Sequence, residues 1–208
     1  MLDKANDSWN RVARRYASMP IRNPAAYEAT LARVRTHLKP EHSVLEMGCG
    51  TGTTALRLGP DVARYLASDS APEMIAIARE KCVPAGLAKP GFFVAGIGDG
   101  SLPEGPFDVV VAFNLLHLLP DRKAALSEIR MMLPEGGLFI SKTPCLGGVF
   151  RALQPLVAVL RWMRKAPDIR FVTPSLLERE IRETGFEIIE NGDYPKRPPS
   201  HFIVARKL

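Results

Sequence analysis

Three glycines that follow a short apolar run form the stretch of the sequence with the clearest chemical use. Gly48, Gly50 and Gly52 come directly after this run, and Glu46 stands just before them. Closely spaced glycines at the end of a strand let the backbone turn sharply and approach a ligand at the N-terminus of the next helix. We therefore expect a nucleotide-like ligand at this glycine loop, residues 48–52.

The spacing and charge of the glycine loop indicate which ligand it takes. Its pattern is G-x-G-x-G, whereas dinucleotide-binding loops carry G-x-G-x-x-G and turn their backbone toward a pyrophosphate. The carboxylate of Glu46 would repel a pyrophosphate, but it would attract an ammonium or a sulfonium. A nicotinamide-dependent oxidoreductase is therefore the less favoured alternative.

Two further acidic residues follow the next two strand-like runs. Asp69 stands nineteen positions beyond Gly50, where a carboxylate can accept hydrogen bonds from a ribose diol. Asp99 follows the third run and is placed to accept a hydrogen bond from an adenine amino group. Because the carboxyl ends of parallel strands meet at one edge of a sheet, Glu46, Asp69 and Asp99 are expected to converge on one crevice.

Strand-like and helix-like segments alternate from residue 43 onward, which is typical of an α/β fold with a parallel sheet between helices. The expected strands cover residues 43–47, 65–68, 92–95, 107–113 and 138–141. The expected helices cover about 53–58, 72–81, 121–133 and 174–184, with two more helical patterns before the first strand, at 9–16 and 25–38. A loop too short for a crossover helix joins the last two strands, 186–190 and 201–206, so these strands are expected to be antiparallel.

Length and composition favour one domain over the whole chain, residues 1–208. The sequence has 208 residues, of which 46% are hydrophobic and 24% charged, enough for a single full-sized core. No apolar stretch is long enough to cross a membrane, and the N-terminus carries no apolar leader. Three cysteines without a CxxC pair indicate neither a disulfide framework nor a bound metal, so we expect a cytoplasmic protein.

The net charge of +6 is unevenly distributed along the chain. Residues 1–40 hold eight Lys and Arg against three acidic residues, and residues 146–170 hold five against one. The stretch between them is slightly acidic, with nine basic residues against twelve acidic ones. The positive charge therefore belongs to two segments that flank the expected ligand-binding sheet.

Five segments carry motifs in a fixed order along the chain: residues 44–52, 68–74, 98–99, 107–117 and 133–137. Together they resemble the class I S-adenosylmethionine-dependent methyltransferases, and within them the small-molecule type typified by the ubiquinone and menaquinone biosynthesis enzymes. The resemblance covers residues 9–142 and departs from the family at Glu135, before the paired glycines. It implies a doubly wound, Rossmann-like sheet of seven strands in the order 3-2-1-4-5-7-6, with the last strand antiparallel and helices on both faces.

The resemblance implies S-adenosyl-L-methionine as the cofactor and S-adenosyl-L-homocysteine as its product, with no metal. Gly48, Cys49, Gly50 and Gly52 match the positions that cradle the methionine part of the cofactor. Glu46 matches the position beneath its amino group. The glycine loop would therefore hold the amino-acid end of the cofactor.

Other matched positions are implied to hold the nucleoside end of the cofactor. Asp69 would bind the ribose hydroxyls, and Ser70 and Met74 would line the adenine face. Gly98 and Asp99 would hold the adenine edge. The nucleoside would then cross the carboxyl ends of the second and third strands.

Three residues have roles that bear on the amino-acid end of the cofactor and on the reaction. Asn114 would lie near the methionine carboxylate and amino groups, and Tyr16 either closes over the cofactor or is the apolar end of a lid helix. His117 is a candidate general base or substrate contact, with a histidine that caps the loop or the next helix as the alternative. Methyl transfer is an in-line displacement, so proximity and alignment contribute more than a base.

The two basic segments are expected to act as lids. Residues 1–40 form an N-terminal helical lid, and residues 143–173 form an inserted helical cap. Within that cap, residues 147–165 place apolar side chains largely on one helical face, with basic residues elsewhere. A cover over an apolar substrate pocket is the first interpretation, and the alternatives are a peripheral membrane contact, a dimer face or a packed surface helix.

The sequence predicts methyl transfer to a small, apolar or amphipathic organic acceptor. Nucleic acid is disfavoured because the chain has Asn114-Leu115-Leu116-His117 where base-methylating enzymes carry an (Asp/Asn)-Pro-Pro-(Tyr/Phe) run. A non-catalytic, S-adenosylmethionine-binding regulatory protein is the alternative from another class. The identity of the acceptor, its methylated atom and the oligomeric state are left open.

Overall fold

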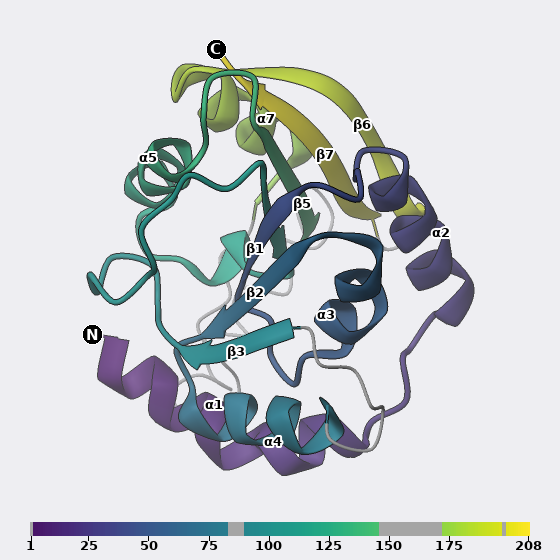
Figure 1. The fold of residues 1–208 in the computed structure, drawn as a ribbon, viewed down its shortest axis with the longest axis vertical. Helices are drawn as coiled ribbons and strands as arrows, with labels where there is room; N and C mark the ends of the chain where they lie inside the picture. Colours follow the sequence, from purple (N-terminus) through teal and green to yellow (C-terminus); the bar gives the residue numbers. More distant parts are fainter. Residues whose placement is uncertain (1, 83–89, 146–171, 197–198) are drawn as a thin grey trace.

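A computed structural model describes residues 2–82, 90–145, 172–196 and 199–208, and the strands among them form one seven-stranded sheet (Figure 1). The strand order is β3-β2-β1-β4-β5-β7-β6, with β7 antiparallel to both of its neighbours. The strands are β1 (Ser43–Met47), β2 (Arg64–Asp69), β3 (Pro90–Val94), β4 (Val109–Phe113), β5 (Leu138–Pro144), β6 (Phe186–Lys196) and β7 (Pro199–Lys207). The structure confirms the expected α/β fold class and strand order.

Helices flank both faces of the sheet (Figure 1). Within the described residues they are α1 (Leu2–Ser18), α2 (Pro24–Arg35), α3 (Thr53–Leu58), α4 (Pro72–Cys82), α5 (Arg122–Met132) and α7 (Pro174–Glu183), with short 3-10 turns η1 (Gly59–Asp61) and η2 (Leu116–Leu118). Local signals explain their starts, since Asn23, Asp121 and Thr173 each cap the following helix through a side-chain oxygen. Each expected helix is confirmed, but α1 begins seven residues before the expected 9–16, α2 ends at Arg35 instead of residue 38, and the ends of the others shift by at most one residue.

Several strands differ in length from the prediction. The structure shortens the expected 107–113 to β4, which begins at Val109, and lengthens 65–68 and 201–206 to the bounds of β2 and β7. The largest extensions are at the ends of β5 and β6. The fifth strand was expected to end at residue 141, but β5 continues to Pro144 because β7 pairs with it as far as Pro144 opposite Ser200. The sixth was expected to end at residue 190, but β6 continues to Lys196 along the same partner. The extra length places Lys142 and Thr143 within the sheet.

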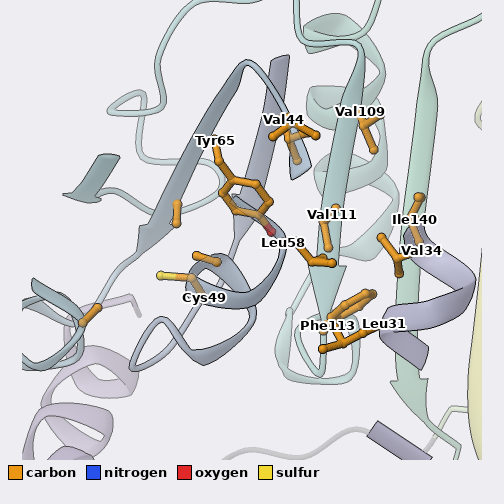
Figure 2. Close-up of a cluster of buried hydrophobic side chains, with 14 of the residues drawn as sticks. Leu31, Val34, Val44, Cys49, Leu58, Tyr65, Val109, Val111, Phe113 and Ile140 are labelled. Carbon is orange, nitrogen blue, oxygen red and sulfur yellow. The ribbon is translucent and has the colours of Figure 1, made fainter. Parts of the chain in front are cut away.

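The central strands bury side chains on both faces, as their continuous apolar runs predict. On one face, Figure 2 shows side chains of α2 and α3 beside those of the strands, namely Leu31, Val34, Val44, Leu58, Tyr65, Val109, Val111 and Ile140. On the other face the strands pack against α5 and α7 through Leu45, Met47, Val110, Phe139, Leu126, Ile129, Leu177 and Ile181. These two cores fix the carboxyl ends of β1, β2 and β4 relative to one another.

Helix α1 lies along α4 at one end of the sheet (Figure 1). Its Ala13 is buried against Met74 and Ile77 of α4. The guanidinium of Arg14 contacts the carboxylates of Glu73 and Glu80, each at 2.7 Å. Since this ion-pair network is exposed, packing of the apolar side chains contributes most to holding α1 in place.

Most of the cap expected at residues 143–173 lies outside the described residues, including all of 147–165. Its two described edges are both buried. The backbone N–H of Cys145 donates to the carbonyl of Pro199 at 3.0 Å, and Val172 packs in the same core as Leu177 of α7. The chain therefore leaves the sheet at one fixed point and returns at another.

Candidate functional site

The glycine loop needs glycine for both its backbone conformation and its close packing. Gly48, Gly50 and Gly52 have φ of 67°, 54° and 74°, a left-handed region that residues with a Cβ rarely adopt. A Cβ on Gly52 would lie 2.8 Å from the ring of Phe92, and one on Gly48 would lie 2.9 Å from a methyl of Leu115. The loop therefore packs closely against Phe92 of β3 and Leu115 after β4.

Asp69 ties the glycine loop to the end of β2. Its Oδ2 accepts a hydrogen bond from the backbone N–H of Gly50 at 2.9 Å, and its Oδ1 accepts one from Ala71 at 2.9 Å. Burial raises the pKa of the Asp69 carboxyl, and these two backbone hydrogen bonds oppose that rise. Asp69 thus lies at the edge of the glycine loop, where the sequence predicts a ribose-binding carboxylate.

Glu46 is a buried carboxyl behind the glycine loop. It is 2% exposed, and the hydroxyl of Tyr65 donates to its Oε2 at 3.0 Å. Burial raises the pKa of Glu46 to about 8, with a smaller contribution from the nearby Asp69 and opposition from the Tyr65 hydrogen bond. At neutral pH the isolated protein therefore holds Glu46 mostly protonated, and a cationic group beside it would favour its ionised form.

Cys49 lies inside the loop as a buried thiol. Its backbone N–H donates to the carbonyl of Ser68 at 2.9 Å, which joins the loop to β2. Burial raises the pKa of its thiol well above the ordinary value, with Glu46 and Asp69 adding to the rise. Cys49 is therefore a packing residue of the loop and a poor nucleophile.

The loop after β3 brings Asp99 and Ser70 close to each other. A Cβ on Gly96 would lie 3.0 Å from Oδ2 of Asp99 and 3.1 Å from Cβ of Ser70. Asp99 accepts hydrogen bonds from the backbone N–H groups of Gly96 and Ser101, both at 2.8 Å, and from the Ser101 hydroxyl. Burial acts to raise the pKa of Asp99, but these hydrogen bonds together hold it below the ordinary value. Asp99 is thus ionised and shapes its own loop.

Two other residues expected at the adenine are held by contacts that the sequence did not reveal. The backbone N–H of Gly98 donates to Oε2 of Glu128 on α5 at 2.8 Å. Met74 is buried in the small core between α4 and α1, together with Ala13. Both contacts join segments that are distant in sequence, so no local pattern could have indicated them.

Tyr16 lies over the glycine loop from the side of α1. The nearest side-chain atom to a Cβ on Gly50 would be Cε1 of Tyr16, at 3.9 Å. The side chain packs edge-on against Trp9 with 6.2 Å between ring centroids, and the residue remains 47% exposed. Its position agrees with a residue that closes over a ligand on this loop, which stays a prediction.

Beyond β4, the chain turns sharply at Asn114. This residue has a φ of 54°, and its backbone N–H donates to the carbonyl of Lys142 at 2.7 Å. Three residues later, His117 in η2 is 8% exposed, and no described residue bonds its buried Nδ1. Burial lowers the pKa of His117 to about 4, so the imidazole is neutral at physiological pH.

Lys142 on β5 is a candidate that the sequence analysis missed. Its Nζ donates to Oγ1 of Thr30 on α2 at 2.8 Å, and burial lowers the pKa of the ammonium to about 8. The expected fifth strand stopped one residue short of it. The signal that could have found it is its place two residues after the buried Ile140, on the same face of the strand.

The described residues contain no group of three or more His, Cys, Asp or Glu side chains arranged to hold a metal ion. None of the described helices is long and apolar enough to cross a membrane.

This sheet order, with a glycine loop after β1 and a loop-binding carboxylate at the end of β2, is the fold of the class I S-adenosylmethionine-dependent methyltransferases. The chain belongs to the family described as "Methyltransferase domain", whose profile matches residues 19–191.

Two curated proteins illustrate the range of its relatives. Trans-aconitate 2-methyltransferase of Rhodococcus jostii (strain RHA1) is 30% identical over 152 residues, which are 69% of this chain and 55% of that protein. Hybrid PKS-NRPS synthetase mpsA of Macrophomina phaseolina (strain MS6) is 30% identical over 136 residues, which are 60% of this chain and 3% of that protein. The chain thus spans little more than half the length of the first and a small part of the second.

Among solved structures, magnesium protoporphyrin IX methyltransferase from Synechocystis PCC 6803 with bound SAH is similar to this chain. The TM-score is 0.73 at 17% identity, and the match covers 97% of this chain and 94% of that one. At this identity the similarity establishes the shared fold.

Proposed function

We propose that this protein transfers a methyl group from S-adenosyl-L-methionine to a small organic acceptor with an apolar body. The observation that carries the proposal is the placement of buried Glu46 behind a glycine loop whose backbone is tied to Asp69. A carboxyl buried in this way gains from a cationic partner, and the cofactor carries both an ammonium and a sulfonium. Among the described residues, only Tyr16 comes within 4 Å of the place that a Cβ on Gly50 would occupy, at 3.9 Å.

The residues fit the cofactor at its two ends. Glu46 and the glycine loop would hold the amino-acid end, and Asp69 would hold the ribose through the lone pairs that its backbone bonds leave free. Ser70 and Asp99, which lie together around Gly96, would hold the adenine. When bound, the cofactor supplies an electrophilic methyl group on a sulfonium, and its reaction leaves a neutral thioether.

What the chain itself contributes is mainly position and exclusion of water. Tyr16 would cover the glycine loop, and the buried core beneath keeps the loop fixed. His117 is neutral, and its buried Nδ1 has no hydrogen-bond partner among the described residues. In the tautomer that leaves a lone pair on this nitrogen, it would accept a hydrogen bond or proton from an acceptor hydroxyl that reaches it. A pKa near 4 makes it a weak base, so we assign most of the rate to alignment.

An apolar acceptor is supported by side chains on α1 and the following turn. Val12, Tyr16, Met19 and Ile21 are all exposed, and Tyr16 among them borders the glycine loop. Residues 1–40 and 143–173 are included in the proposal as lids of one domain, with 147–165 as the cover of the acceptor. A cytoplasmic location is included as well, supported by the buried thiols of Cys49 and Cys145.

Calorimetry with S-adenosyl-L-homocysteine tests the cofactor site. Wild-type protein should bind it, and Asp69→Ala should weaken binding by at least about 10-fold, because hydrogen bonds to a charged group are lost. Asp61→Ala is the matched control, since Asp61 is an exposed carboxylate paired with Arg35. Absence of binding to the wild type, or equal affinities in all three proteins, would contradict the proposal.

Methyl transfer itself is tested with labelled S-adenosyl-L-methionine and a panel of small acceptors. Label should appear in at least one apolar or amphipathic acceptor. Tight binding of the cofactor without transfer to any member of a broad panel would instead favour the non-catalytic, cofactor-binding alternative.

A further inference from the structure

We propose that Lys142 binds a carboxylate group at the carboxyl end of β5. This inference rests on the proposed function, because it assigns one more ligand contact to the same site. The carboxylate has two sources, the amino-acid end of the cofactor or an acid group on the acceptor. The chemistry of recognition is the same for both, an ammonium facing a carboxylate.

The surroundings of Lys142 on the sheet are apolar. In the strand register it stands between Phe113 of β4 and Phe202 of β7, both buried in the core on that face. Ile140, two residues earlier on β5, belongs to the same core. Because Lys142 is half-buried in this row, its ammonium has a desolvation cost that a bound anion would offset.

The described part of the protein satisfies the Lys142 ammonium only in part. Nζ of Lys142 donates one hydrogen bond, to the hydroxyl of Thr30, which in turn donates to the carbonyl of Ala26 at 2.7 Å. No ion pair joins Lys142 to a carboxylate among the described residues. Two of its three N–H donors thus lack a partner there.

A partly buried cation without a carboxylate partner among the described residues, as at Lys142, differs from other cations of the chain. Arg33 pairs with Glu190 and Arg122 with Glu180, so each of these guanidinium groups has its own carboxylate. Lys81 also bonds only a hydroxyl, but it lies in the last turn of α4, where the helix dipole favours a cation. Lys142 lies on a strand and has no such compensation.

The location of Lys142 connects it to the candidate site. Its carbonyl accepts the N–H of Asn114, the residue expected near the carboxylate of the cofactor. Thr30 lies one helical turn after Tyr27, whose hydroxyl is 3.3 Å from that of Thr54 at the start of α3, just beyond the glycine loop. Helix α2 therefore links Lys142 to the glycine loop along one wall.

Glu46 and Lys142 stand on the same face of the sheet with opposite chemistry. Glu46 of β1 pairs with Val111 of β4, which pairs with Ile140 of β5, and Lys142 follows Ile140 by two residues. The strands that carry Glu46 and Lys142 are thus two apart in the sheet, with roughly 10 Å between their axes. One end of this row favours an ammonium and the other a carboxylate. A zwitterionic amino-acid group, or a cofactor beside an acidic acceptor, matches that arrangement.

Calorimetry on Lys142 variants tests the proposal. Lys142→Met removes the charge at similar length, Lys142→Arg keeps it, and Lys123→Met is the control because Lys123 is exposed and paired with Glu183. Each protein is titrated with S-adenosyl-L-homocysteine and with 5′-methylthioadenosine, which lacks the amino-acid group. The cofactor-loaded proteins are then titrated with acetate, benzoate and trans-aconitate.

The two sources of the carboxylate give different results. If the carboxylate is that of the cofactor, Lys142→Met weakens S-adenosyl-L-homocysteine by about 10- to 100-fold and leaves 5′-methylthioadenosine unchanged. If the carboxylate belongs to the acceptor, the same variant binds both nucleosides with unchanged affinity, and it no longer binds the carboxylate that the loaded wild type binds. In either case Lys142→Arg retains more affinity than Lys142→Met, and the control matches the wild type.

Two results together overturn the proposal. Lys142→Met binds S-adenosyl-L-homocysteine as tightly as the wild type does, and the loaded wild type binds none of the three carboxylates more tightly than the loaded variant does. Unchanged binding of 5′-methylthioadenosine shows that a variant is folded. Failure of the wild type to bind S-adenosyl-L-homocysteine is a separate result, because it counts against the proposed function.

Discussion

The protonation of Glu46 predicts opposite effects of one substitution on stability and on ligand binding. Glu46→Gln keeps the size of the side chain and an oxygen that can accept from the Tyr65 hydroxyl, but it removes the ionisable proton. In the folded protein burial raises the pKa of Glu46 to about 8, above the ordinary value of 4.5. The folded state therefore holds a proton that the unfolded state releases between these two values.

The sign of the pH effect follows from that difference. The contribution of the protonated carboxyl to stability is fully present below the unfolded pKa, and it is lost as pH rises through the folded pKa near 8. At about 1.4 kcal/mol per pH unit, the wild type should lose about 4 kcal/mol between pH 5 and pH 8 from this group. Glu46→Gln lacks this loss, so it should become more stable than the wild type as pH rises.

Ligand binding should change in the other direction. An ammonium beside Glu46 stabilises the carboxylate, so binding of S-adenosyl-L-homocysteine at pH 7 should release a proton from the wild type. Glu46→Gln should bind more weakly and release none. Urea unfolding at pH 5.5, 7 and 8.5 measures the first effect, and calorimetry in buffers of different ionisation enthalpy measures the second. Parallel stability curves for the two proteins, together with no proton release by the wild type, would refute the reasoning.

Other consequences of the structure can be measured separately. Gly52→Ala should lower the free energy of unfolding by about 2–4 kcal/mol, because its φ is 74° and the new Cβ would lie 2.8 Å from Phe92. Gly136→Ala, where φ is 79° with open space around it, should cost about 1 kcal/mol, so equal losses in urea unfolding would contradict the packing argument. Tyr16→Ala should weaken the binding of S-adenosyl-L-homocysteine by about 10-fold, while Tyr16→Phe should bind it as the wild type does. Calorimetry measures both affinities, and an unchanged affinity of Tyr16→Ala would show that Tyr16 does not cover the ligand. Because the pKa of His117 is lowered to about 4 by burial, its imidazole resonances should keep their neutral positions from pH 8 to pH 6, and a titration step in that range would show the side chain to be solvated.

The local parts of the site were predictable from the sequence. The apolar run of β1, the glycines after it and the spacing to Asp69 are features of short segments, and the structure places them as expected. The strand order followed from the family resemblance, which carries information about chain connections that composition lacks.

The parts that were missed depend on pairing between distant segments. Lys142 lies in the sheet because it pairs with Phe113 of β4 and with Phe202 of β7, and the second of these partners is sixty residues later in the chain. Glu128 on α5 accepts a hydrogen bond from the backbone N–H of Gly98 in the loop after β3, and Met74 is buried by the docking of α1. Hydrophobic periodicity reports which face of an element is buried, but it does not report which element covers that face.

The buried edges of the inserted segment bear on how the substrate range of this fold can change. Cys145 is bonded to β7, and Val172 is packed into the core beside α7, so both junctions are fixed by the sheet. Glu46 lies on β1, the glycine loop follows that strand, and Asp69 lies on β2; within the described part of the chain, the side-chain hydrogen bonds of Glu46 and Asp69 involve neither junction. If residues 146–171 cover the acceptor as we propose, a graft that ends at these two junctions would change the acceptor and leave the glycine loop, Asp69 and Glu46 unaltered.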